Sequence, residues 1–260
     1  IFSKGGFVSV PVVMAAKLAN VPVVVHESDV TPGLANKIAQ PFASHVFTVF
    51  NETLSHLPQD KATCVGSVIR EQLYEGNRDR GRSLCGFYNT KKVLLIMGGS
   101  LGSVVINEAV RSNLPKLLET FNIIHLCGKG NVNKELKTFN GYCQFEYVTT
   151  ELSDLLYASD YIVSRAGSNS IFEFLALHKP MLLIPLSAAK SRGDQILNAK
   201  LFEKKRLAHV LQEEDLTRKS FIKAIEKLVA EEEQLIDAMT EVKAPITPSE
   251  MVKLITQYEK

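Results

Sequence analysis

The chain has 260 residues, of which 45% are hydrophobic and 22% are charged, and its formal net charge at pH 7 is +2. This composition is typical of a folded globular protein and excludes a disordered or collagen-like chain. The near-neutral charge gives no electrostatic reason to expect nucleic-acid binding. No apolar run approaches the ~18–20 residues that a membrane-spanning helix needs.

The four cysteines, Cys64, Cys85, Cys127 and Cys143, show neither a CxxC pair nor a spacing with histidine that would ligate zinc. Their pattern favours reduced thiols in a cytosolic protein over a disulfide framework. We therefore expect no metal site at these residues.

The first 65 residues hold only part of an α/β domain. A helix is predicted over Pro11–Asn20, and buried strands are predicted over Val21–Val25 and His45–Val49. A complete domain of this class needs several βαβ units of ~30 residues each. Because the chain also begins at Ile1 without a start methionine, we expect the remaining units to lie upstream.

From Lys91 onward, short apolar runs alternate regularly with helical patterns. Six strands are predicted, at Val93–Met97, Ile123–Leu126, Gln144–Val148, Tyr161–Ser164, Met181–Ile184 and His209–Leu211. The helices between them are predicted near Ser103–Glu119, Asn133–Thr138, Ser153–Ala158, Ser170–Leu177 and Asp194–Lys204. This alternation predicts a doubly wound, parallel, Rossmann-like sheet with right-handed crossovers.

Polar segments flank this second domain. The stretch from Val68 to Asn89 is interpreted as a hinge and the entry to the domain. Thr217–Thr240 is charged and amphipathic, which predicts two surface helices. A last helix is predicted over Glu250–Tyr258, with Thr247 or Ser249 as its cap.

A glycine-rich segment, Gly98–Ser103, directly follows one of the predicted strands and precedes a helix. Glycines in this place allow backbone N–H groups to approach an anion, and the helix N-terminus adds positive potential. The spacing matches neither GxGxxG nor the Walker pattern. A tight strand-to-helix turn without a ligand therefore stays open as the alternative.

A second segment of small residues, Ala166–Ser170, also follows a strand and opens a helix. Its size leaves room for a ligand near unpaired N–H groups. Glu173 lies one turn into the helix, where a carboxylate can accept hydrogen bonds from both hydroxyls of a ribose. The alternative is that Ser170 and Glu173 form a capping box, which stabilises the helix without any ligand.

Two further polar segments stand at predicted strand ends. Asp194 and Gln195 follow the strand Met181–Ile184 and suit sugar hydroxyls, although Asp194 could also be a solvated residue in a first helical turn. His26 and Glu27 follow the first predicted strand, where they could act as acid and base. A polar loop with an aspartate cap explains the same residues without catalysis.

The three segments of the second domain end strands of one sheet, so we expect them to converge on one edge. Together they suit a nucleotide with a pyrophosphate and an attached polyol. The sequence contains no GxSxG signature of a serine nucleophile.

Five ordered motifs carry a resemblance to a known family. They are Lys4–Pro11, His26–Asp29, Gly98–Gly102, Ser164–Ser168 and Asp194-Gln195, within a similarity that runs from Phe2 to the last helix. The chain resembles glycosyltransferase family 28, and in particular its peptidoglycan N-acetylglucosaminyltransferases, which make lipid II from lipid I.

The resemblance implies a GT-B architecture, with two Rossmann-like α/β domains that contain parallel sheets. Residues 1–69 would be the C-terminal part of an incomplete acceptor-binding domain, and residues 70–245 would bind UDP-GlcNAc. Residues 246–260 would form a final helix that returns to the N-terminal domain.

The resemblance also implies roles in holding the donor's pyrophosphate. Ser100 and the backbone amides of Ser168, Asn169 and Ser170 would bind it, and Arg70 would pair with a phosphate.

Other positions would bind the rest of the donor. Val148 would contact uracil through its backbone, and Glu173 would hold the ribose. Asp194 and Gln195 would bind the hydroxyls of GlcNAc, and Asp29 would approach the sugar from the other domain.

The implied reaction is an inverting transfer of GlcNAc from UDP-GlcNAc to the C4 hydroxyl of MurNAc in undecaprenyl-linked lipid I, without metal or cofactor. His26 and Glu27 are the catalytic candidates within this chain. The resemblance further implies a peripheral protein at the cytoplasmic face of the cell membrane. Cell-wall or division proteins would be its partners, with roles in cell shape and the cell cycle.

Two other functions stay open at this point. The chain could be a non-catalytic, donor-binding subunit of a split N-acetylglucosaminyltransferase, which a continuous upstream frame with a glycine-rich βα start would exclude. It could also be an enzyme like UDP-GlcNAc 2-epimerase, which product analysis would reveal because that reaction needs no lipid acceptor.

Overall fold

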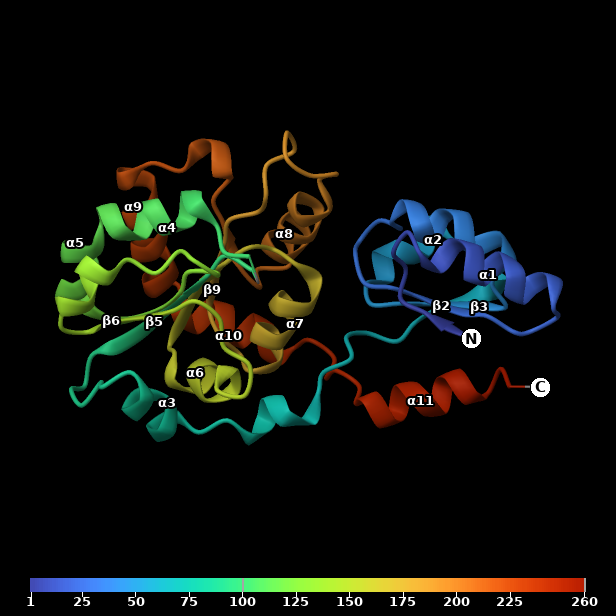
Figure 1. Cartoon of the computed structure of the whole chain (residues 1–260), viewed down its shortest axis with the longest axis horizontal. Coiled ribbons are helices and arrows are strands. Elements are labelled where there is room, and N and C mark those ends of the chain that lie inside the picture. Colours follow the sequence, from blue (N-terminus) through green and yellow to red (C-terminus); the bar gives the residue numbers. More distant parts are fainter. Residues whose placement is uncertain (100, 260) are drawn as a thin grey trace. The chain divides into compact units, whose positions relative to one another are not determined.

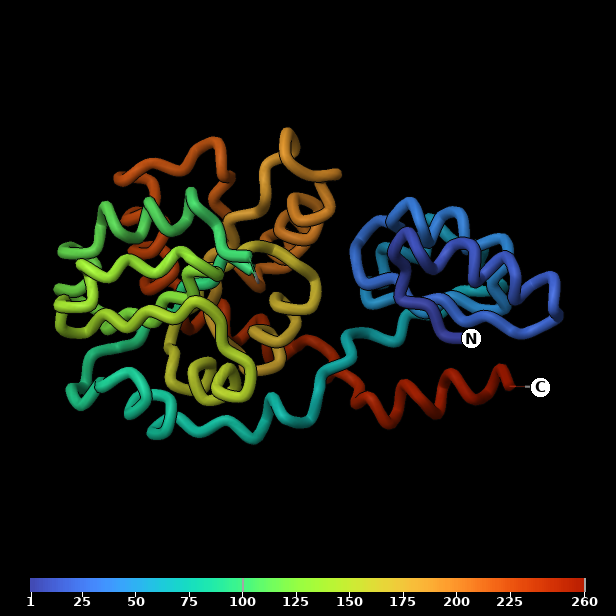
Figure 2. The backbone as a smooth tube through the Cα atoms, viewed as in Figure 1, coloured from blue at the N-terminus to red at the C-terminus, as the bar shows by residue number. Residues whose placement is uncertain are grey.

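The computed structural model describes residues 1–99 and 101–259, and its internal contacts divide the chain into two compact units. The first unit comprises residues 1–71 and 243–260, and the second comprises residues 72–242. The sequence analysis placed the corresponding boundaries after residues 69 and 245. Figure 1 labels the elements of both units, and Figure 2 traces the backbone.

The first unit contains a four-stranded parallel sheet whose strands follow one another in chain order. The strands are β1 (Phe2–Ser3), β2 (Val24–Glu27), β3 (His45–Thr48) and β4 (Ala62–Cys64). Its helices are α1 (Ser9–Leu18), α2 (Leu34–Ala39) and α11 (Pro248–Thr256), with short 3₁₀ segments at Gln40–Phe42, Asn51–His56 and Gln59–Lys61. The core under α1 is formed by small apolar side chains such as Val13, Val25 and Val46.

The C-terminal helix α11 belongs to the core of the first unit. Met251 is 5% exposed and packs with Val24 and Phe47 of the sheet. The ring of Tyr258 stacks on His45 with centroids 4.8 Å apart. Thr247 caps the helix through a reciprocal pair of hydrogen bonds with Glu250, as one of the two predicted caps.

The second unit contains a six-stranded sheet with the order β10-β9-β8-β5-β6-β7, and all of its pairings are parallel. The strands are β5 (Lys92–Met97), β6 (Phe121–Leu126), β7 (Tyr142–Phe145), β8 (Tyr161–Ser164), β9 (Met181–Leu183) and β10 (His209–Val210). The chain builds outward from β5 to β7, crosses back to β8 and builds outward again. This confirms the predicted doubly wound topology and places the reversal of strand order between β5 and β8.

Helices cover both faces of this sheet (Figure 1). They are α3 (Arg78–Leu84), α4 (Val104–Ser112), α5 (Leu114–Thr120), α6 (Leu152–Ala158), α7 (Ser168–Ala176), α8 (Asp194–Lys204), α9 (Arg218–Ala230) and α10 (Glu232–Thr240), with 3₁₀ segments at Glu71–Glu75, Lys134–Thr138 and Glu213–Asp215. Helix α4 contacts α9, and α3 packs on α6. The two surface helices predicted within Thr217–Thr240 are α9 and α10.

The segment 68–89, interpreted as a hinge and the entry to the second domain, contains helix α3 in its second half. Asn77 caps this helix by accepting a hydrogen bond from the backbone N–H of Arg80. Gly81 lets α3 approach α6 closely, because a Cβ atom there would lie 2.1 Å from the carbonyl oxygen of Asp154. Arg80 also binds both carboxylate oxygens of Asp154. Tertiary contacts of this kind leave no periodic signal in a charged segment.

Two other predicted elements needed correction, and one strand was missed. The single helix expected over Ser103–Glu119 is split at Asn113, because Pro115 lies in the first turn of α5 and cannot continue the hydrogen-bonding pattern of α4. The short strand β4 had no counterpart among the predictions. The segment Lys134–Thr138 forms a 3₁₀ turn where an α-helix was expected.

Candidate functional site

The loops that follow β5 and β8 stand at the point where the strand order reverses. Met97 and Ser164, the last residues of these strands, are register partners in the sheet. Open α/β sheets bind ligands at the carboxyl ends of the strands at this reversal. The fold therefore brings together the two glycine-containing segments that the sequence singled out.

The loop after β5 is held in place by close backbone contacts at its glycines. Gly102 has a φ of +76°, and a Cβ atom there would lie 2.0 Å from the carbonyl oxygen of Cys127. Gly128, on the loop after β6, has a φ of +89°. A Cβ atom there would lie 2.4 Å from the carbonyl oxygen of Leu101. Only glycine satisfies both the backbone conformation and the space at these positions. Ser100, the predicted phosphate ligand in this loop, lies outside the described residues.

Helix α7 begins at Ser168, with Gly167 in extended conformation as its N-cap. The predicted capping box of Ser170 and Glu173 is therefore wrong, because Ser170 already lies inside the helix. The first backbone N–H groups of a helix, here those of Ser168, Asn169 and Ser170, have no acceptor within the helix and carry the positive end of its dipole. This end of α7 faces the edge of the sheet at which β8 terminates.

Arg165 connects the loops at this edge through hydrogen bonds, a role that was not predicted from the sequence. Its guanidinium is buried and donates hydrogen bonds to the carbonyls of Ile184 and Pro185 at 3.0 and 3.1 Å. It also donates to Ser103 Oγ at 2.7 Å and pairs with Glu213. Its partners come from 19 to 62 residues away, so no local pattern could have found them.

The carboxylate of Glu213 is held between two cations. Lys190 Nζ lies 2.8 Å from Glu213, which also pairs with Arg165. Burial opposes ionisation, but the hydrogen bonds from Lys190 and Arg165 outweigh it and lower the pKa of Glu213. Glu213 therefore remains charged and supports the cluster of loops.

The start of α8 lies beside the same edge. Asn198 Nδ2 donates to the carbonyl of Ala166 at 3.2 Å, which attaches α8 to the loop after β8. Gln195 accepts a hydrogen bond from the backbone N–H of Leu186 at 3.1 Å through its Oε1. Asp194 pairs with Arg192 at 3.2 Å and is three-quarters buried. The predicted sugar-binding pair thus sits at the expected edge, with both side chains already engaged in local contacts.

The other two predicted contacts of the second unit are both partly exposed. Val148 lies in the loop between β7 and α6, three residues after β7 ends. Glu173 lies in the second turn of α7. Their proposed contacts with uracil and ribose stay predictions.

In the first unit, Glu27 organises the loop that follows β2. Its carboxylate is buried and accepts hydrogen bonds from the backbone N–H groups of Asp29 and Gly33 at 3.0 and 2.9 Å. It also accepts from Asn36 Nδ2 at 2.7 Å. Three donors fix this carboxylate in place, so its geometry is that of a loop-positioning group. Its catalytic role stays a prediction.

His26 is the other predicted catalytic candidate, and it is 2% exposed at the end of β2. Its Nδ1 lies 3.3 Å from Ser28 Oγ, while its Nε2 is buried without a hydrogen-bond partner among the described residues. Burial, and then the charge of Lys4, lower the pKa of His26 to about 4. At neutral pH the imidazole is therefore neutral and can accept a proton at one nitrogen.

The depressed pKa of His26 makes stability depend on pH. The unfolded chain takes up a proton near pH 6.5 and the folded chain only near pH 4, so stability falls as the pH falls through this window. We expect wild type to lose roughly 3 kcal/mol relative to His26→Gln between pH 6.5 and pH 4. Urea unfolding of both proteins at several pH values measures the difference, and a difference that stays constant would contradict the assignment.

The remaining two predicted donor contacts, Asp29 and Arg70, also belong to the first unit. Asp29 is partly buried, and its carbonyl accepts a hydrogen bond from Thr53 Oγ1 at 3.1 Å. Arg70 is exposed, directly before the crossover to the second unit. Their proposed contacts with donor stay predictions.

Two features are absent from the described residues. No group of three or more histidine, cysteine or acidic side chains is arranged to hold a metal ion there. No helix in the described part is both long enough and apolar enough to cross a bilayer.

Two family models match the chain in the order of its two units. Residues 1–48 match the glycosyltransferase family 28 N-terminal domain, and residues 93–254 match the glycosyltransferase family 28 C-terminal domain. The chain belongs to glycosyltransferase family 28. The edge between β5 and β8 therefore lies in the C-terminal domain of this family.

Close relatives in the family share one name, UDP-N-acetylglucosamine–N-acetylmuramyl-(pentapeptide) pyrophosphoryl-undecaprenol N-acetylglucosamine transferase. The protein from Geobacillus thermodenitrificans is 60% identical over 88% of this chain and 64% of its own length. The protein from Clostridium botulinum is 52% identical over the whole chain and 73% of its own length. The chain thus spans about two thirds of the length of the curated relatives it matches.

Solved structures confirm the family's fold for this chain. The MurG crystal structure from Acinetobacter baumannii superposes with a TM-score of 0.76 at 23% identity, over 98% of this chain and 72% of that one. UDP-GlcNAc 2-epimerase from Neisseria meningitidis has a TM-score of 0.68 at 15% identity, over 98% of this chain and 74% of that one. These likenesses establish the predicted GT-B class with its parallel sheets.

Proposed function

We propose that the chain is the larger part of an inverting N-acetylglucosaminyltransferase. It would move GlcNAc from UDP-GlcNAc to the C4 hydroxyl of MurNAc in undecaprenyl-linked lipid I and so form lipid II. The observation that carries this proposal is the 52–60% identity to relatives whose name states this donor and this acceptor. The likeness to an epimerase is far weaker at 15% identity, so the epimerase alternative is not favoured.

The chemistry of the edge between β5 and β8 fits the donor. When the acceptor hydroxyl attacks the anomeric carbon, negative charge develops on the departing UDP. The N–H groups at the start of α7 and the positive end of its dipole would stabilise that charge from fixed positions, with no reorganisation during the reaction. Arg165 would act indirectly, because it holds the loops that present these groups.

The other donor contacts follow from the placement of the side chains. Glu173 would accept hydrogen bonds from the ribose hydroxyls, and the backbone of Val148 would contact the uracil. Gln195 uses its Oε1 for Leu186, so it would offer its amide N–H groups to the sugar. Of the two catalytic candidates, His26 has a ring nitrogen without a hydrogen-bond partner among the described residues, whereas the carboxylate of Glu27 is fully engaged. A pKa of about 4 makes His26 a weak base at physiological pH.

We further propose that the enzyme works at the cytoplasmic face of the cell membrane, because its acceptor is lipid-linked. Exposed apolar side chains in the first unit support this, with Phe7 at 90%, Leu18 at 87% and Leu34 at 64% exposure. Lys17 and Lys37 lie on the same two helices, α1 and α2. Basic and apolar side chains together favour contact with anionic lipid surfaces.

The donor assignment is tested with UDP-GlcNAc, UDP-GalNAc, UDP and 2′-deoxy-UDP in calorimetric titrations. We expect selective binding of UDP-GlcNAc, and a weaker affinity for 2′-deoxy-UDP than for UDP. Glu173→Gln should remove most of the preference for the ribose hydroxyl, with Glu214→Gln as an exposed control. Equal affinity of wild type for UDP and 2′-deoxy-UDP would refute the ribose contact.

Transfer is tested separately with radiolabelled UDP-GlcNAc and lipid I. We expect label in lipid II when the family's preceding segment is fused upstream of Ile1. Release of free sugar without an acceptor, or donor binding without any transfer by the fused protein, would contradict the proposed reaction.

A further inference from the structure

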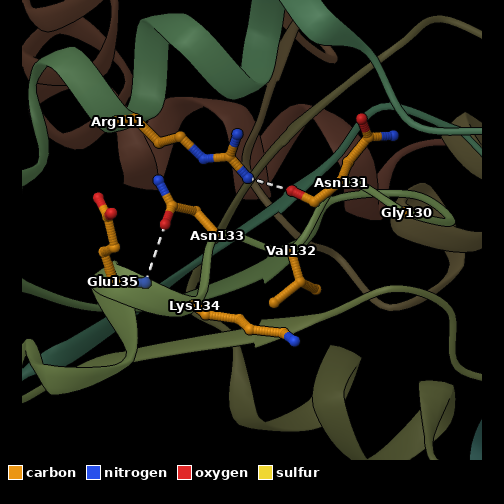
Figure 3. A pocket seen from close by; sticks show the side chains of 7 residues that line it. All are labelled: Arg111, Gly130, Asn131, Val132, Asn133, Lys134 and Glu135. Atoms are coloured by element: carbon orange, nitrogen blue, oxygen red, sulfur yellow. Dashed lines mark hydrogen bonds between the residues drawn. The ribbon is translucent and has the colours of Figure 1, made fainter.

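A polar pocket opens on the second unit beside the loop that follows β6. Its volume is about 470 Å³, and it lies between the end of α4 and the segment after β6. Figure 3 shows Arg111 reaching from α4 towards this segment. The lining consists of Arg111, Gly130, Asn131, Val132, Asn133, Lys134 and Glu135. None of these residues was assigned a role above.

Arg111 is a half-buried cation whose charge is not balanced. One terminal nitrogen donates to the carbonyl of Asn131 and lies 3.7 Å from Cys127 Sγ. Its Nε is buried and has no hydrogen-bond partner among the described residues. No carboxylate of the described residues forms an ion pair with it, although Glu135 also lines the pocket. A cation without an ion-pair partner at the wall of a polar pocket points to an anionic ligand.

Neighbouring buried groups also respond to the positive charge of Arg111. Burial and then Arg111 lower the pKa of His125 to about 3, so this histidine is neutral and cannot add to the charge. His125 is fixed between Tyr142 Oη and Asn107 Oδ1, each at 2.8 Å. The polar network below the pocket thus contains no anion that would satisfy Arg111.

Hydrogen bonds between side chains and the backbone hold the lining segment in a defined shape. Gln144 accepts from the backbone N–H of Asn133 at 3.1 Å and donates to its carbonyl at 2.9 Å. Asn133 in turn accepts from the N–H of Glu135 at 2.9 Å. A ligand would therefore meet a prearranged surface, which reduces the entropy lost on binding.

We propose that this pocket binds the phosphate group of a small, soluble phosphorylated molecule. The accessible part of the Arg111 guanidinium would donate a charge-assisted hydrogen bond to a phosphate oxygen. Lys134 at the rim would add a second positive charge. The carboxylate of Glu135 also lines the pocket, so a ligand would have to bind these cations more strongly than this carboxylate does. The volume accommodates a phosphate with a body of several carbon atoms.

The pocket is tested by NMR titration with inorganic phosphate and with glycerol 3-phosphate, in the presence of saturating UDP. UDP would occupy the proposed donor site, so effects that remain at residues 130–135 report on the pocket. We expect shifts of the backbone amides of residues 130–135, and a tighter affinity for glycerol 3-phosphate than for inorganic phosphate. Absence of these shifts in wild type at up to tens of millimolar ligand would overturn the proposal.

Variants locate the site. Arg111→Gln should weaken binding by about tenfold, because it removes a charge-assisted hydrogen bond. Arg218→Gln removes an exposed arginine on α9 and should leave the affinity unchanged. If Arg111→Gln unfolds the protein, the exposed rim variant Lys134→Gln should still weaken binding by about twofold to threefold and reduce its salt dependence. Unchanged affinity in both pocket variants would also overturn the proposal.

Discussion

Replacing Gly102 with alanine is expected to remove donor binding and to destabilise the second unit by about 2–5 kcal/mol. The φ of +76° costs an alanine about 1–2 kcal/mol. The remainder comes from the new Cβ atom, which would lie 2.0 Å from the carbonyl oxygen of Cys127. That oxygen belongs to the backbone and cannot rotate away, so the loop after β5 must separate from the loop after β6.

The matched control is Gly86→Ala. Gly86 has a similar φ of +70°, but no heavy atom lies within 4 Å of its ideal Cβ position. It should therefore show only the backbone cost and retain its affinity for UDP-GlcNAc. Urea unfolding and calorimetric titration of the two variants separate the effects. Equal stability losses would mean that the loop contact contributes nothing beyond backbone conformation.

Much of the second unit could be predicted because its signals are local. The strand Tyr161–Ser164 and the helix Asp194–Lys204 have the predicted bounds. A run of buried β-branched residues or an amphipathic pattern carries this information within one segment. Strand β7 (Tyr142–Phe145) begins two residues and ends three residues before the predicted strand Gln144–Val148.

The candidate site could be predicted as a set of loops but not as a set of contacts. The parallel topology alone brings the ends of β5 and β8 together, so the glycine segments converge as expected. The orientation of side chains depends on partners that are distant in sequence. Glu27 therefore looked like a possible acid or base, whereas the fold surrounds its carboxylate with the N–H groups of its own loop.

The capping box at Ser170 and Glu173 illustrates the same limit. The residue types and their spacing satisfied the sequence rule. The helix starts two residues earlier, because Gly167 leaves β8 in an extended conformation and the chain turns into α7 at once. Where a helix starts depends here on the geometry of the strand before it, which the rule does not include.

Replacing Arg165 with methionine is expected to be the most destabilising single change, at about 3–5 kcal/mol. It removes the donor that the carbonyls of Ile184 and Pro185 share, and it leaves Glu213 buried beside Lys190 alone. A loss of this size is a large share of the 5–15 kcal/mol that stabilises a typical domain. Affinity for UDP-GlcNAc should fall as well, because the loops after β5, β8 and β9 lose their common anchor.

The double variant Arg165→Met/Glu213→Gln distinguishes loss of packing from an uncompensated charge. If the buried carboxylate causes most of the damage, the double variant should be more stable than Arg165→Met alone by about 1–3 kcal/mol. If the double variant is no more stable, the hydrogen bonds to Ile184, Pro185 and Ser103 carry the effect. Urea unfolding of the two single variants and the double variant completes the cycle.

The charge of Glu213 also predicts the acid response of the second unit. Its pKa in the folded state is lower than the ordinary value of 4.5, so the unfolded chain takes up this proton first as the pH falls. The stabilisation is complete above pH 4.5 and disappears as the pH falls through the folded-state value. Glu213→Gln should therefore lose less stability than wild type between pH 5 and pH 3. Parallel acid-unfolding curves would show that the Arg165 cluster is held by its carbonyl contacts and not by its ion pair.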